Sequence, residues 1–173
     1  DYYDTLRFDP SRAARDLWQQ ALHHENYREF LQAIDLYRQF IAEFPGNDNL
    51  DDAFFHIGEC YRQMKILFED INKAKGPDDL YRLSDSYQIA TGARQMIPAA
   101  DELLAIQDAS SAYAVIINDF FGSPLRDDAL YQIAIAYTPY ENPEAVPPDA
   151  AYTFQQLLIH FPGSEHEFEA TVK

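Results

Sequence analysis

The clearest feature of this chain is one spacing of apolar residues that occurs three times. In each copy a small residue is followed by apolar residues at i+4, i+7, i+8 and i+11, which form one face of an α-helix. A further alanine lies nine residues after the last of these positions. The copies are Ala33, Tyr37, Phe40, Ile41, Phe44 and Ala53; Ala109, Tyr113, Ile116, Ile117, Phe120 and Ala129; and Ala150, Phe154, Leu157, Leu158, Phe161 and Ala170. Matched copies predict a repeated helix–turn–helix unit, in which each helix buries its apolar face against its neighbours.

The residues between the helical segments predict where one helix ends and the next begins. Pro45-Gly46 ends the first helix, because proline cannot continue the hydrogen-bond ladder and glycine accepts left-handed geometry. Asp51 and Asp52 precede the next helix, and we expect them to accept hydrogen bonds from its first N–H groups. Within that helix, Gly58 is small enough to let a neighbouring helix approach closely. The pattern therefore predicts an all-α fold of closely packed helices.

The units resemble tetratricopeptide repeats. The small and aromatic positions of that family's helices A and B are matched by Ile57-Gly58 with Tyr61, Ile133-Ala134 with Tyr137, Ala33 with Tyr37 and Pro45, and Ala150 with Phe154 and Pro162. The first helix A departs from the family pattern at Gln20 and His24. The Phe-Pro-Gly-Asn/Ser turn is similar to the BamD-like and Tol–Pal-associated proteins of the bacterial envelope. The resemblance implies a right-handed solenoid of antiparallel helix pairs, with about 7–8 helices in a single domain over residues 1–173.

The spacing between copies predicts an insertion. The first two copies lie 76 residues apart and the last two lie 41 apart, against about 34 for an ordinary unit. We expect one long helix over 53–75 and an inserted helix over about 79–96. The repeat-like units then span about 11–62, 98–137 and 147–173. The sequence stops inside a helix A, so we expect either a fragment or a last helix that another chain completes.

The charge of the chain narrows the class of partner. The formal net charge is −16, so nucleic acid and anionic membrane surfaces are poor partners, whereas cationic proteins and divalent metal ions suit it. No apolar run approaches the ~20 residues of a membrane span, so we expect no membrane insertion. The first residue is Asp1, as in a processed secreted protein or in a chain shortened at its start. Together with the family resemblance, this favours a periplasmic, cell-envelope or extracellular location.

Aligning the helix A segments predicts a partner-binding surface. In tetratricopeptide arrays helix A lines the concave face, and the alignment places one aromatic residue of each unit at the same position. With their flanking charged residues, the candidates are Trp18, Phe55, Tyr131, Arg15, Glu59 and Asp128. An aromatic row beside carboxylates suits an extended peptide with apolar and basic side chains. The alternative is that these aromatic residues pack against the neighbouring helix B.

A cluster of oxygen-bearing side chains predicts a possible Ca²⁺ site. Asn47, Asp48 and Asp51 lie within one turn, and Ca²⁺ prefers such ligands, although turn formation and helix capping explain them equally. Asp127-Asp128 and residues 165–169 are poorer candidates unless two subunits combine them. His160 and His166 flank a Pro-Gly turn without a cysteine to join them, which favours ordinary surface histidines. We expect no other cofactor.

The sequence carries no phosphate-binding loop, nucleophile elbow, paired cysteines or zinc-protease motif, so we expect no enzyme activity. Two functions remain open. One is an envelope adaptor that holds a peptide or partner protein in the concave groove. The other is a self-assembling extracellular subunit, in which Ca²⁺ offsets repulsion between acidic copies. The single Cys60, placed inside a helix, is expected to be an inert buried thiol.

Overall fold

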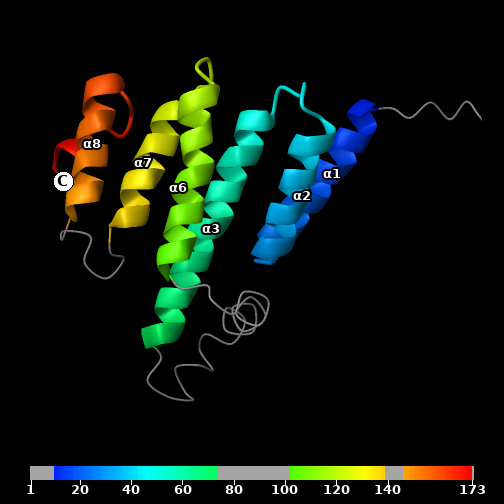
Figure 1. Ribbon diagram of the computed structural model, residues 1–173, viewed down its shortest axis with the longest axis horizontal. Coiled ribbons are helices and arrows are strands. Elements are labelled where there is room, and N and C mark those ends of the chain that lie inside the picture. Colours follow the sequence, from blue (N-terminus) through cyan, green and yellow to red (C-terminus); the bar gives the residue numbers. More distant parts are fainter. Residues whose placement is uncertain (1–9, 74–101, 139–145, 173) are drawn as a thin grey trace, which may run out of the picture.

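A computed structural model of the chain describes residues 10–73, 102–138 and 146–172 (Figure 1). These residues form seven α-helices and no strand. The helices are α1 (Pro10–Asn26), α2 (Phe30–Glu43), α3 (Leu50–Lys73), α6 (Glu102–Asp119), α7 (Arg126–Tyr137), α8 (Pro148–His160) and α9 (Glu167–Thr171). The predicted all-α class is confirmed for this part of the chain, and the inserted helix expected at 79–96 lies outside it.

Each helix packs against the next one along the chain, so the described helices stand side by side in a row (Figure 1). α3 and α6 pack together although a long segment separates them in the sequence. The long helix expected at 53–75 is α3. None of the described helices is both long and apolar enough to cross a membrane.

The three predicted turns close with the same set of hydrogen bonds. In the first, Phe44 N–H donates to the carbonyl of Phe40 at 3.0 Å, and Asn47 N–H donates to the carbonyl of Phe44 at 3.0 Å. The Asn47 side-chain oxygen accepts from Asn49 N–H at 3.0 Å, and Ala53 N–H donates to the carbonyl of Asn49 at 3.0 Å. The corresponding bonds of the other two turns are 2.8 to 3.2 Å long, and in each pair the first residue donates its N–H to the second. In the second turn they join Phe120 to Ile116, Ser123 to Phe120, Leu125 to the Ser123 hydroxyl and Ala129 to Leu125. In the third they join Phe161 to Leu157, Ser164 to Phe161, His166 to the Ser164 hydroxyl and Ala170 to His166. The repeat read from apolar spacing is therefore also a repeat of backbone geometry.

The expected placement of Asp51 and Asp52 ahead of the helix is wrong, although Asp51 does accept one of the first N–H groups of that helix. α3 begins at Leu50, so both aspartates lie inside its first turn, where Asp51 accepts from Asp52 N–H at 3.1 Å. The side chain that accepts a backbone N–H ahead of the helix is Asn47, because it sits at the closing position of the preceding turn. The two aspartates still place negative charge at the positive end of α3.

The turn glycines do not all adopt left-handed geometry. Gly163 has φ 86°, but Gly46 does not have a positive φ. Gly46 and Gly163 each stand at the third position of a four-residue turn. That position has a positive φ in a type II turn and a negative φ in a type I turn, so equivalent turns of this chain close with either geometry. Glycine is required for its φ angle at Gly163 alone among the described glycines.

Small residues bring the helices into close contact, as predicted. A Cβ built on Gly58 in α3 would lie 2.5 Å from the ring of Tyr113 in α6. Tyr113 and the alanine that opens its copy, Ala109, are fully buried. Cys60 is also buried, and burial raises the pKa of its thiol, which keeps it protonated and unreactive. The contact between α3 and the Tyr113 ring of α6 thus depends on the absence of one methyl group at Gly58.

Candidate functional site

The three aromatic residues of the predicted partner row each pack against the aromatic residue of the following helix B. The Trp18 ring lies 5.3 Å from that of Tyr37 at 71°, and the Phe55 ring lies 5.4 Å from that of Tyr113 at 65°. The Tyr131 ring lies 6.1 Å from that of Phe154 at 60°. These edge-to-face pairs occupy equivalent positions, and we call them the aromatic ladder. All three helix A rings are half-buried, so the packing role weighed as the alternative is present in the structure.

The carboxylates that flank this row are already bonded within the chain. Glu59 accepts from the Tyr113 hydroxyl at 2.6 Å, and the guanidinium of Arg62 contacts both of its carboxylate oxygens, at 3.1 and 2.6 Å. Asp128 is paired with His166 at 2.6 Å. Arg15, by contrast, lies exposed on α1. A basic peptide would therefore compete with internal partners for two of the predicted residues, and their part in binding stays a prediction.

A further carboxylate, Glu25, holds a pair of side chains that the sequence did not predict as partners. Glu25 accepts from the Tyr37 hydroxyl at 2.6 Å and is paired with His56 Nδ1 at 2.9 Å. The His56 ring is stacked on Tyr37 with 5.1 Å between centroids. Burial first, and then the bond to Glu25, raise the pKa of Tyr37 strongly, so its hydroxyl stays a donor. The available signal was the repeat itself: a tyrosine at a buried ladder position needs an acceptor, whereas Phe154 at that position does not.

A buried lysine joins α3 to the end of α7. Lys65 is 4% exposed, and its ammonium donates to the carbonyls of Ala136 at 2.9 Å and Thr138 at 3.2 Å. The last carbonyls of a helix have no partner within that helix, and the dipole there favours a cation. The position of this lysine is therefore accounted for by helix capping.

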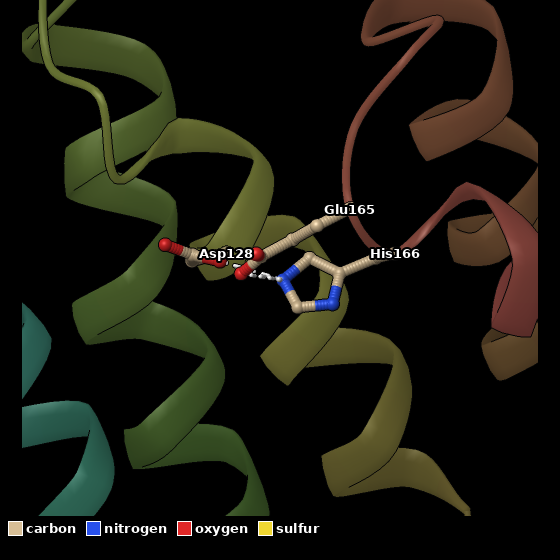
Figure 2. Close-up of side chains that lie close together, drawn as sticks. All are labelled: Asp128, Glu165 and His166. Atoms are coloured by element: carbon tan, nitrogen blue, oxygen red, sulfur yellow. Dashed lines mark hydrogen bonds and ion pairs between the residues drawn. The ribbon is translucent and has the colours of Figure 1, made fainter.

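The turn before α9 brings three potential metal ligands together, and we call them the α7–α9 cluster. Figure 2 shows Glu165 and His166 reaching from this turn toward Asp128 in the first turn of α7. His166 Nε2 lies 2.6 Å from Asp128 Oδ1 and 3.9 Å from Glu165 Oε1. One ligand atom from each residue lies within 4.8 Å of the others. Sequence reasoning had treated residues 127–128 and 165–169 as separate acidic segments.

The surroundings of the cluster hold it in place. The His166 ring is stacked on Tyr131, with 4.0 Å between centroids and 6° between planes, and the Tyr131 hydroxyl donates to Glu169. Ser164 donates to Asp127 at 2.8 Å, which fixes the turn against α7. His160 is not part of the cluster, since its Nε2 contacts Gln156 at 3.1 Å.

The side chains of the predicted Ca²⁺ site serve the turn and the start of α3. Asn47 accepts from a backbone N–H at 3.0 Å, Asp51 accepts from another at 3.1 Å, and Asp48 is exposed. Burial and the charge of Asp51 raise the pKa of the neighbouring Asp52. Among the His, Cys, Asp and Glu side chains that the structure describes, the only group of three whose ligand atoms converge is the α7–α9 cluster. The Ca²⁺ site at Asn47, Asp48 and Asp51 stays a prediction.

The chain matches no known family description and no curated protein.

Proposed function

We propose that the chain is a non-enzymatic scaffold for protein–protein interaction, built as a tetratricopeptide-like, right-handed solenoid. The observation that carries this proposal is the threefold repetition of one turn, with its hydrogen bonds, and of one aromatic pair. Helices that pack mainly on their chain neighbours form an extended array, and such arrays present equivalent positions in a line. This favours recognition of a long segment of a partner protein.

Charge indicates the kind of segment. The net charge is −16, and on the helices of the proposed binding face Asp16 is exposed on α1, while Asp52 on α3 and Asp127 on α7 are half-buried. A partner with lysine or arginine side chains would associate faster and with higher specificity on such a surface. Because the Trp18, Phe55 and Tyr131 rings are half-buried, apolar side chains of the partner would contact their edges between the helices. The proposed location is the bacterial periplasm or envelope, or the extracellular space.

Amide NMR spectra of the full chain test this proposal. The probe is a short peptide of alternating lysine and leucine, and the control replaces each lysine by glutamate. The proposal expects the lysine peptide alone to shift amide signals, mainly in α1, α3 and α7, with weaker binding at high salt. Equal shifts from both peptides, or shifts confined to α2, α6 and α8, would contradict it.

A second candidate function is self-assembly, and a specific observation favours it. Of the six large apolar residues that are exposed among the described ones, Tyr27 and Phe121 lie elsewhere and four lie between the start of α8 and the residue after α9, namely Tyr152, Ile159, Phe168 and Val172. Exposed apolar groups gathered on one part of a molecule mark interaction surfaces. Size-exclusion chromatography with light scattering separates the two functions: a monomer at all concentrations, with and without CaCl₂, excludes self-assembly. A particle mass that grows with protein concentration in the wild type, but not in Ile159→Asp or Val172→Asp, would favour self-assembly.

A further inference from the structure

We propose that the α7–α9 cluster binds one divalent transition-metal ion of the zinc type through Asp128 Oδ1, Glu165 Oε1 and His166 Nε2. The primary observation is that a single imidazole nitrogen faces two carboxylate oxygens, at 2.6 and 3.9 Å. The carboxylates come from two segments, the first turn of α7 and the turn before α9 (Figure 2). A cation between them would replace one hydrogen bond by bonds to all three ligands.

Comparison within the chain shows why this cluster differs from the other histidine–carboxylate pairs. His24 and His56 each have one carboxylate partner among the described residues, Glu29 and Glu25 respectively. The Glu25 oxygen that contacts His56 also accepts the Tyr37 hydroxyl, so that pair is internally satisfied. In the α7–α9 cluster the second carboxylate faces the same nitrogen as the first. Among the described residues, only this group supplies three donors, the number that catalytic zinc sites use with water as the fourth ligand.

The mobility and charge of the ligands also suit a metal ion. His166 is held by the Tyr131 ring and its side chain is 17% exposed, whereas that of Glu165 is 80% exposed and can turn inward. Residues 127–128 and 165–169 hold five carboxylates and a single imidazole, His166, which is paired with two of them. A divalent cation offsets that repulsion. On binding, the ion takes the Nε2 lone pair, and any proton on that nitrogen passes to solvent.

The ligand chemistry selects zinc-type ions over Ca²⁺. Ca²⁺ takes six to eight oxygen ligands, whereas an imidazole with two carboxylates is a set for Zn²⁺ or its neighbours in the transition series. Bonds of about 2.0–2.2 Å would require the His166 and Asp128 donors to separate slightly from their present contact. Because the turn before α9 is fixed against α7, a small rotation of the Asp128 carboxylate would supply this separation. The ion would join α9 to α7 and hold the end of the helical row.

Isothermal titration with ZnSO₄ on the full chain, freed of metal with EDTA, tests the proposal. We expect one ion per chain for the wild type, and an affinity about 10–100-fold lower for Glu165→Gln and for His166→Gln, since losing even an outer-shell partner costs that much. The matched controls are His160→Gln and His56→Gln, which remove imidazoles outside the cluster and are expected to keep wild-type affinity. Circular dichroism verifies that each variant is folded. Of the variants, Glu165→Gln should disturb folding least, because the Glu165 side chain is exposed.

Titration with Co²⁺ adds a spectroscopic readout. The proposal expects the visible absorption of four-coordinate Co²⁺ in the wild type, with loss of that absorption in Glu165→Gln and full retention in His160→Gln. The proposal is overturned if the wild type takes up no zinc, if the cluster variants and the control variants bind zinc equally, or if CaCl₂ competes with zinc at equal concentration.

Discussion

Replacing Gly58 by alanine tests the close packing of α3 against α6. The added Cβ would lie 2.5, 2.6 and 2.8 Å from three atoms of the Tyr113 ring, distances at which something must move. Tyr113 cannot move freely, because it is fully buried, packs against Phe55 and donates its hydroxyl to Glu59 at 2.6 Å. Overpacking of this kind costs about 1–3 kcal/mol, and a rigid neighbour places the cost near the upper end.

The helix propensity of alanine offsets part of that cost. Alanine is favoured over glycine inside a helix by about 1 kcal/mol, so we expect Gly58→Ala to lower the free energy of unfolding by roughly 2 kcal/mol. For a chain of this size that corresponds to a fall in Tm of about 4–8 °C. Urea unfolding followed by circular dichroism measures the change, and Trp18 fluorescence gives a second probe on another helix.

Two controls isolate the steric contact. A Cβ on Gly46 or Gly122 meets nothing within 4 Å, so alanine there is expected to leave stability within about 0.5 kcal/mol of the wild type. In a Tyr113→Leu background, Gly58→Ala should cost clearly less than in the wild type, because the ring that it strikes is gone. If Gly58→Ala is as stable as the wild type or more stable, α3 and α6 are not in the contact described here.

The remaining predictions concern single polar groups. Lys65→Met removes the ammonium that donates to two carbonyls at the end of α7, so we expect the free energy of unfolding in urea to fall by about 1–3 kcal/mol. An unchanged midpoint of unfolding would contradict the capping role. Burial and a hydrogen bond to a carboxylate on α9 raise the pKa of Tyr131 from 10.0 to about 12, so its contribution is complete below pH 10 and is lost as pH rises toward 12. Stability measured against pH should therefore fall less steeply above pH 10 in Tyr131→Phe, and parallel curves would refute this. Asn47→Ala and Ser123→Ala remove the same turn acceptor, so each should cost about 0.5–2 kcal/mol in thermal unfolding, and a negligible loss for either would contradict equivalent turns. Ser164→Ala removes that acceptor and also the bond to Asp127, so it should cost at least as much.

The sequence was enough to predict a helix and its buried face where the pattern of apolar residues within that one helix decides both. The apolar spacing around Tyr37, Tyr113 and Phe154 gave the buried face of each helix B, and all three residues are buried. The absence of a side chain at Gly58 predicted a close helix contact, which the Tyr113 ring makes. These inferences succeed because helical periodicity relates positions that are near in sequence.

Side-chain partners could not be predicted where they depend on how segments return to one another. The α7–α9 cluster forms only because a turn places Glu165 and His166 against a helix that begins 40 residues earlier, at Arg126. Asp51 and Asp52 were expected to precede a helix, but α3 already begins at Leu50, and the bond from Asn49 N–H to the Asn47 side chain belongs to the turn before it. Sequence spacing gives the distance along one element, whereas these contacts lie between elements.

The aromatic ladder is the central structural claim, because it sets the same alignment in each unit. Nuclear Overhauser spectra of the full chain test it most directly, through contacts between ring protons. The account predicts cross-peaks for all three edge-to-face pairs, Trp18 with Tyr37, Phe55 with Tyr113, and Tyr131 with Phe154. Cross-peaks that link these helix A rings to other aromatic residues, with none inside the three pairs, would contradict the shared alignment and the scaffold built on it.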